Sequence, residues 1–241
     1  IWRNGWCRAL INRTNKMKTL IKITILSLFL LVGLKSMSQT LGVKAGLNLS
    51  TMHVKYSASD GENHQLNPGF HIGPTLEIPI NKTLSVETGL LLSSKGFRIK
   101  GEHAYLNEFI KQNEKLNLLY LDIPITAKLS FDVGSQQIYG KLGPYFSTGL
   151  TGRYNTGLKV EGTQKTYELD VDFGSNKEEG DLKRFDYGLI AGVGINLNKI
   201  QVEVNYSLGL ANVNAFKYLN NATKATNRVV GISVAYKFGR I

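Results

Sequence analysis

Cysteine is almost absent from the sequence. Cys7 is the only one among 241 residues. Disulfides, thiolate metal sites and cysteine nucleophiles are therefore excluded from the remainder of the chain. Because no cysteine follows the apolar run near the N-terminus, a lipid-anchored lipoprotein is excluded as well.

Long apolar runs are also scarce. The one clear run, Ile23–Leu34, has 12 residues, whereas a spanning helix needs roughly 20. It follows Met17 and two lysines and precedes the triplet Ser36-Met37-Ser38, so residues 17–38 are expected to be a secretory signal peptide cleaved before Gln39, rather than a membrane helix. Residues 1–16 are interpreted as sequence translated upstream of the true start, with a genuine N-terminal extension as the alternative.

Acidic residues are absent before residue 39, where seven of the 29 Lys and Arg residues lie. The remainder of the chain has 22 basic and 18 acidic residues, so the formal charge of +11 falls to +4 there. No basic stripe with interleaved aromatic residues remains, which excludes a nucleic acid as partner. Nucleotide-binding loops are missing too, and no cofactor is expected.

What the remaining residues 39–241 do contain is strict alternation of apolar and polar side chains, which predicts β-strands. Each segment is about ten residues or longer, as a tilted transmembrane strand requires. The eight expected strands are Leu41–Thr51, Gly69–Ile80, Leu84–Ile99, Leu116–Phe131, Gln137–Thr151, Phe185–Leu197, Ile200–Ala211 and Arg228–Phe238.

The connections alternate between short and long. Short turns are expected at 81–83, 132–136 and 198–199, and long polar loops at 52–68, 100–115, 152–184 and 212–227. The motif KTYELDVDF within the longest loop predicts an extra hairpin there. Short turns at one rim and long loops at the other are typical of a bacterial outer-membrane barrel with periplasmic termini and extracellular loops.

The polar face decides between this barrel and a soluble one with its apolar face inward. Glycine, serine and asparagine dominate that face, and small residues suit the narrow interior of an eight-stranded barrel. Val202 and Val204 should then face lipid, and Glu203 the lumen. The expected fold is all-β, an eight-stranded antiparallel transmembrane up-and-down β-barrel with outer-membrane lipid around it.

Two further residue types bear on the strands. Pro74 and Pro144 interrupt apparent strands, and each removes a ladder hydrogen bond, so bulges or unpaired backbone are expected there. Aromatic residues near strand ends suit the membrane interfaces and recognition by the barrel-assembly machinery, although aromatics are common in any strand. These are Phe131, Tyr187, Tyr206, Tyr236 and Phe238.

The segments YLDIPITAKLSF, GKLGPYFSTGLTG, FDYGLIAGVGINL, VEVNYSLGLANV and NRVVGISVAYKF together resemble the PorT-like outer-membrane β-barrel family of Bacteroidetes, across about residues 40–241. The resemblance implies an eight-stranded barrel in the outer membrane of a Gram-negative bacterium. The named member of that family is associated with protein secretion and gliding. The ending Gly239-Arg240-Ile241 departs from the terminal aromatic residue of many such barrels.

Charged residues on the polar face are the main candidate site. Four acids and five bases are nearly balanced, which favours an internal salt-bridge plug, since an unpaired buried charge is costly. A proton or ion path is the alternative. The nine residues are Lys44, Glu77, Glu87, Lys95, Asp122, Lys128, Lys141, Glu203 and Lys237.

The spacing of histidines and acidic residues gives little support for a catalytic or metal-binding site. Of the four histidines, His53, His64 and His103 are expected on or near surface loops and His71 near the top of its strand, and no spacing assembles them with a serine and an acid. Asp170 and Asp172 could bind Ca²⁺, but the EF-hand ligand order is missing and a solvated acidic loop is the simpler interpretation.

The expected function is that of a small non-catalytic outer-membrane barrel with a structural or surface-interaction role and a plugged polar lumen. A component or assembly factor of a secretion apparatus is the second hypothesis, with surface or secretion-system proteins as partners. A lipid-modifying outer-membrane enzyme is the third.

Overall fold

The computed structural model describes residues 39–56, 65–105, 108–160, 163–174, 182–214 and 222–240. The chain divides into Ile1–Gln39 and Thr40–Ile241, and the fold below is that of the second unit. The predicted extension 1–16 and signal peptide 17–38 lie outside the described residues. Among the residues described, no helix has the length and apolar character needed to span a bilayer.

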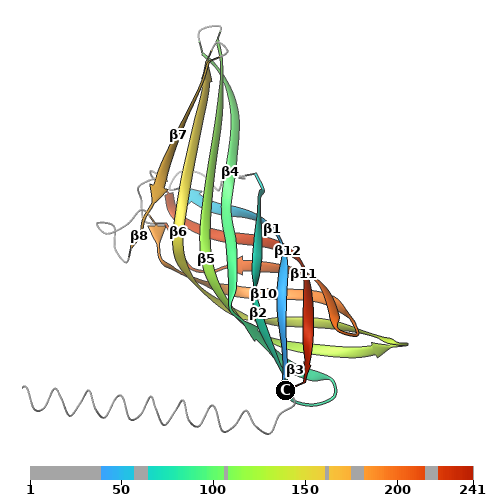
Figure 1. The fold of residues 1–241 in the computed structure, drawn as a ribbon. Helices are drawn as coiled ribbons and strands as arrows, with labels where there is room; N and C mark the ends of the chain where they lie inside the picture. The colour runs from blue at the N-terminus through green and yellow to red at the C-terminus, as the bar shows by residue number, and fades with distance from the viewer. Residues whose placement is uncertain are drawn as a thin grey trace, which may run out of the picture. The chain divides into compact units, whose positions relative to one another are not determined.

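The described part of the chain is built from antiparallel strands that close into a barrel, with one short parallel pair, β8 and β9, outside the wall (Figure 1). The strands are β1 (Thr40–Tyr56), β2 (Asn67–Pro79), β3 (Leu84–Gly89), β4 (Leu91–Tyr105), β5 (Glu108–Val133), β6 (Gln136–Val160), β7 (Thr163–Val171), β8 (Phe173–Gly174), β9 (Leu182–Lys183), β10 (Phe185–Leu197), β11 (Ile200–Gly209) and β12 (Ala222–Arg240).

Eight wall positions account for the closed barrel. They run β1, β2, β3 with β4, β5, β6, β10, β11 and β12, and β12 pairs with β1 along the whole of β1. Strands β3 and β4 share one position because both pair with β2 and β5. The predicted eight-stranded up-and-down barrel is confirmed.

The two rims differ. At the short-turn rim lie the turns around Asn81, Gly134 and Asn198, together with Thr40 and Arg240. Gly134 and Asn198 have φ angles of 64° and 56°, the left-handed conformation that Gly and Asn adopt most easily in tight hairpins. The opposite end, here called the long-hairpin rim, carries β7 and the far ends of β4, β5 and β6, which project beyond the barrel wall (Figure 1).

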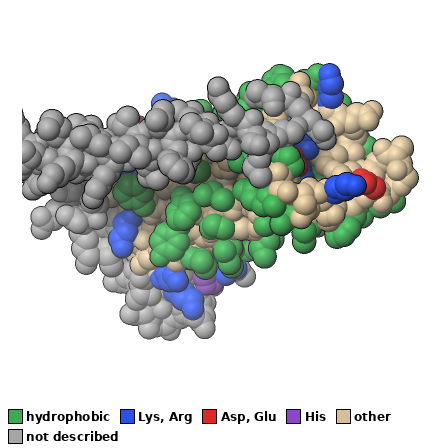
Figure 2. Space-filling view, turned by 90° about the horizontal axis from the view of Figure 1, so that it is seen from below, with side chains coloured by type: hydrophobic (Ala, Val, Ile, Leu, Met, Phe, Trp, Pro, Cys, Tyr) green, Lys and Arg blue, Asp and Glu red, His purple; other side chains and the backbone are tan. Residues whose placement is uncertain are grey.

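The predicted orientation of the wall is confirmed. Val204 is 47% exposed while its neighbour Glu203 is 1% exposed, and the same alternation recurs around the barrel. Bulky apolar side chains such as Leu47, Val193 and Ile232 stand on the outer surface. In the face seen in Figure 2, hydrophobic side chains gather over the wall and charged side chains lie at its margins.

Several strands are longer than their alternation predicted. Strands β4 and β5 continue to Tyr105 and from Glu108, so most of the expected loop 100–115 is wrong as a loop. Strand β6 continues to Val160, β1 to Tyr56, and β12 begins at Ala222, which shortens the other three expected loops in the same way. The extra hairpin predicted from KTYELDVDF is confirmed as β7, paired with β6.

The missed extension of β1 has a physical cause: its alternation is inverted. Along β1 the outward side chains change from Leu47 and Leu49 to His53 and Lys55, while Met52 and Val54 turn inward and are fully buried. A search for an outward apolar face therefore ends at Thr51, although the strand does not.

Both proline predictions are confirmed. Opposite Pro74 the wall strand breaks at Leu90, whose N–H donates to the Pro74 carbonyl over 3.0 Å. Next to Pro144, the pairing of β5 with β6 stops at Pro124 and resumes at Ala127.

Candidate functional site: the barrel interior

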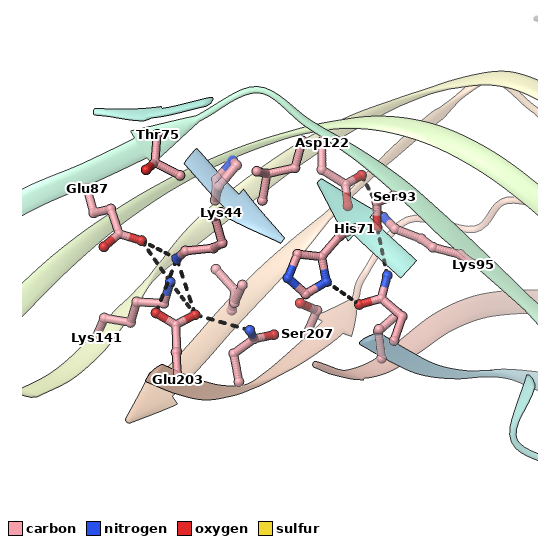
Figure 3. A pocket seen from close by; sticks show the side chains of 16 residues that line it. Lys44, His71, Thr75, Glu87, Ser93, Lys95, Asp122, Lys141, Glu203 and Ser207 are labelled. Atoms are coloured by element: carbon pink, nitrogen blue, oxygen red, sulfur yellow. Dashed lines mark hydrogen bonds and ion pairs between the residues drawn. The ribbon is translucent and has the colours of Figure 1, made fainter. Parts of the chain in front are cut away.

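Four side chains form a closed ring of alternating charges across the lumen. Lys44 Nζ lies 2.6 Å from Glu87 Oε1 and 3.2 Å from Glu203 Oε2. Lys141 Nζ lies 3.1 Å from Glu87 Oε1 and 2.8 Å from Glu203 Oε1. Since these residues come from β1, β3, β6 and β11, the ring ties four wall strands together through the interior (Figure 3).

The charges continue toward the short-turn rim. Lys128 Nζ, fully buried, lies 3.0 Å from Glu77 Oε2 and 3.6 Å from Glu87 Oε2. Lys237 Nζ reaches the same Glu77 oxygen over 2.8 Å. Gln201 fills the remaining space by donating to Glu87 and Glu203 and accepting from Lys128.

A second cluster lies on the other side of the ring. Lys95 Nζ is 3.0 Å from Asp122 and 3.4 Å from Asp186, and it stands 4.7 Å from the ring centroids of both Tyr120 and Tyr145. A buried cation over aromatic faces gains attraction that partly offsets its lost hydration.

Asp186 was missing from the predicted set, although it alternates between Phe185 and Tyr187 and could have been found by that signal. All nine predicted charges lie in the interior and join one or other cluster. With Asp186 the set of paired charges among the described residues comprises five acids and five lysines, so the predicted excess of one positive charge is removed. These ten residues are called the charged tier below.

Hydrogen bonds complete the interior around His71. Its Nδ1 lies 2.8 Å from Asn48 Oδ1, and the amide of Asn48 donates to Ser93 and to two backbone carbonyls. A cavity of about 40 Å³ lies between this group and the ring, which leaves room for only a few water molecules. The imidazole thus contacts an amide rather than the hydroxyl that a hydrolytic group would require.

The other histidines are not brought to this site. His53 and His103 lie in β1 and β4 rather than in loops, and His64 lies outside the described residues. Asp170 and Asp172 are exposed, as expected of a solvated acidic segment. Among the residues that the structure describes, no group of three or more His, Cys, Asp or Glu is placed to hold a metal ion.

Glycines make the interior wide enough for these side chains. At Gly194 a Cβ would collide with the hydroxyl of Tyr139, whose ring lies over this glycine and whose hydroxyl donates to Glu203 Oε2 on the next strand over 2.9 Å. Tyr139 and Tyr145 therefore use lumen space that the small residues of β10 leave free. Sequence reasoning did not identify either tyrosine as an interior residue.

Above the charged tier the interior becomes apolar. Phe173 packs edge-to-face on Tyr120 at 5.5 Å and lies where a side chain on Gly149 would be. Backbone bonds fix the segments around it: Val213 N–H donates to Ala225, and Lys183 N–H to Val213. This apolar tier comprises Met52, Val54, Phe97, Leu116, Leu118, Tyr120, Val171, Phe173, Leu182, Ala211, Val213 and Ala225.

A closed barrel with an apolar exterior and paired charges inside agrees with the sequence comparison. Residues 37–214 match the family described as outer membrane protein beta-barrel domain. The chain belongs to this family. No curated protein matches the sequence.

Solved structures similar to this outer membrane β-barrel share little sequence with it. The attachment invasion locus protein Ail of Yersinia pestis is 16% identical, with 84% of this chain and 100% of Ail covered and a TM-score of 0.35. Neisserial surface protein A is 14% identical over 82% and 97%, with a TM-score of 0.38. Outer membrane protein W of E. coli is 16% identical over 84% and 100%, with a TM-score of 0.36.

For an outer membrane β-barrel, the outward wall is the lipid-facing surface. All five predicted interface aromatics stand on that surface, between 42% and 57% exposed. Phe131, Tyr236 and Phe238 lie toward the short-turn rim and Tyr187 toward the long-hairpin rim. Their contact with headgroups and with the assembly machinery stays a prediction.

Proposed function

We propose that this outer-membrane protein is a non-catalytic barrel with a plugged interior that presents its projecting hairpins to a partner protein. The main support is that two successive layers of side chains fill the interior: the charged tier, and the apolar tier next to it toward the long-hairpin rim. A cation that enters would have to break several buried ion pairs, and water would have to displace packed apolar side chains. Both tiers favour a structural role over conduction.

The projecting sheet is the surface that such a role requires. Strand β7 extends the sheet beyond β6, and within the part of the chain that the structure describes it pairs with β6 alone. Its outer edge thus presents a row of backbone N–H and C=O groups, a known template for an added strand. Tyr167 and Leu169 on β7 are 55% and 46% exposed, which supplies apolar contacts beside that edge.

The finer assignment to the PorT-like branch of Bacteroidetes, with an N-terminal signal peptide, is part of this proposal. It is supported by the set of strand segments that resemble that family. In that case the extracellular side is the long-hairpin rim, and the partner is a surface protein. A role as a component or assembly factor of a secretion apparatus is the second candidate, favoured by the same open edge of β7.

Single-channel recording in planar bilayers tests the plug. We expect no steady openings from the wild-type barrel, and openings only from a variant that opens both tiers, Glu87→Ala and Glu203→Ala combined with Phe173→Ala. Heat-modifiable migration on gels would first establish that each protein is folded. Large, steady openings of the wild type would overturn the proposal.

Site-specific crosslinking on intact cells tests the partner. Because the chain has no cysteine after Cys7, Tyr167→Cys on β7 provides a unique thiol on the projecting sheet. Lys55→Cys, at an exposed outward position near the long-hairpin end of β1, is the matched control because the described residues of β1 do not pair with β6 or β7. We expect a discrete protein adduct with Tyr167→Cys only, and co-purification with secretion components together with a secretion defect on deletion would select the second candidate. Equal labelling patterns for both variants would contradict a protein partner at β7.

A further inference from the structure

One glycine faces lipid instead of the lumen. Gly140 lies on β6 between the outward side chains Ile138 and Leu142. It pairs with Leu129 on β5 and with Val193 on β10. In a wall of bulky aliphatic side chains, this position therefore forms a notch, and no heavy atom beyond Gly140 and its two chain neighbours lies within 4 Å of the place where a Cβ would stand.

The notch opens into a groove on the outer surface of about 500 Å³. Its walls are outward apolar side chains from four neighbouring strands, and register places them in two adjacent rows. The groove-lining side chains of these rows are Phe131, Ile138, Ile195 and Val202 in one, and Val193 and Val204 beside Gly140 in the other. The polar side chains of nearby Tyr139 and Glu203 bond to each other on the lumen side.

We propose that this groove is a fixed binding site for one acyl chain of an outer-membrane phospholipid. The groove is continuous with the lipid-facing wall that family membership establishes, so hydrocarbon is its surrounding solvent. A chain lying in it would gain dispersion contacts with walls on both sides and a floor, whereas a chain on the convex wall elsewhere touches protein on one side.

The shape argues against a second barrel as the occupant. Barrel walls are convex, so a second copy would rest on Val193 and Phe131 at the edges and leave the floor at Gly140 empty. Such a void forfeits the contacts that drive association in lipid, where no hydrophobic force between proteins operates. A flexible chain one carbon wide can reach the floor.

Open space at Gly140 allows a clean test. A Cβ at Gly140 meets no neighbour and the φ angle there is not in the left-handed range, so Gly140→Leu should fold and place its side chain in the groove. Ala45→Leu is the matched control, because Ala45 is an exposed outward residue of β1 outside the groove. Val193→Ala is a second variant, which removes one wall.

The measurement is native mass spectrometry of barrels released by increasing detergent from vesicles of dioleoyl phosphatidylethanolamine and phosphatidylglycerol. We expect one phospholipid to stay bound to the wild type and to Ala45→Leu. Retention should fall at least fivefold in Gly140→Leu and more modestly in Val193→Ala. Equal retention by wild type and Gly140→Leu would overturn the site. So would a wild-type dimer that Gly140→Leu dissolves, because it would place a second copy in the groove. The single-channel recordings that test the plugged interior do not depend on either result, because the groove lies on the outer surface.

Discussion

The interior is polar where the exterior is hydrocarbon, and apolar where the exterior is polar. Beside the charged tier the wall presents residues such as Leu47 and Ile232 outward. Beside the apolar tier the outward residues of β1 are His53 and Lys55. The charged tier belongs to a membrane protein, and the apolar tier is built like the core of a soluble one. Whether a tier is polar or apolar thus depends on what surrounds the strands at that level. The backbone sets no preference, because a closed barrel pairs its own N–H and C=O groups in either solvent.

The change between the two patterns marks a boundary of the membrane-spanning part. On β1 the outward apolar series runs from Leu41 to Leu49, and on β5 it runs from Leu119 to Phe131. At about 3.3 Å per residue and a tilt near 40°, these series span roughly 20 to 30 Å along the barrel axis, as expected of an outer-membrane apolar band.

The largest difference between the two tiers is expected in the free energy of unfolding when one charge is removed from the charged tier. Glu87 contacts Lys44, Lys128 and Lys141, so Glu87→Gln removes one negative charge from all three and leaves Glu203 as the one ring carboxylate between Lys44 and Lys141. We expect the free energy of unfolding to fall by about 3–5 kcal/mol. Urea unfolding in detergent micelles measures it.

A balanced double replacement is the control for that loss. Lys141→Met with Glu203→Leu removes one cation and one anion of the ring and leaves Lys44 paired with Glu87. We expect a smaller loss than for Glu87→Gln alone, because no uncompensated charge remains. An equal or larger loss would mean that packing, and not charge balance, dominates the charged tier.

The apolar tier should respond locally. Phe173→Ala removes the ring that covers Tyr120, and a truncation of this kind costs about 3 kcal/mol. The Val213 and Lys183 amides make the backbone hydrogen bonds that hold the segments around Phe173. Hydrogen exchange at these two amides should then accelerate by roughly 100-fold. The amide of Lys44 in the charged tier should keep its protection. Faster exchange at both places would show that the tiers unfold together.

The smallest effect is expected on the projecting sheet, outside both tiers. Arg153 and Glu168 form an ion pair of 3.2 Å with side chains 67% and 55% exposed. Arg153→Ala should change the free energy of unfolding by less than about 1 kcal/mol, and added salt should reduce the difference further. A loss comparable to that of Glu87→Gln would refute the view that burial decides the strength of these pairs.

Alternation was sufficient to predict the barrel wall, because period-two patterning with glycine on one face has few other solutions. It also placed Val204 outside and Glu203 inside. The same rule places Asp186 on the polar face of the expected strand Phe185–Leu197, although the predicted set of interior charges does not include it.

The rest depended on information that a single strand does not contain. At Leu119 and Tyr120 the register of β5 with β6 shifts, so that Gly152 lies over Leu118 in the interior rather than outside. A shift of this kind reverses every later side chain, and no residue near Leu150 announces it. The apolar tier likewise unites residues from seven strands, which only the closed fold brings together.

The seam between β1 and β12 joins the first and last strands of the barrel. Its partners lie up to 200 positions apart in sequence, as in the pair Thr40 and Arg240, so loop-closure entropy makes this the most expensive pairing to form. Until it forms, two long ladders of N–H and C=O groups have no partner, and in hydrocarbon each such group is costly. Membrane insertion and the pairing of β1 with β12 must therefore be nearly simultaneous. A chain shortened before Val229 would lose most of β12 and leave β1 and β11 as two strand edges with unpaired backbone groups.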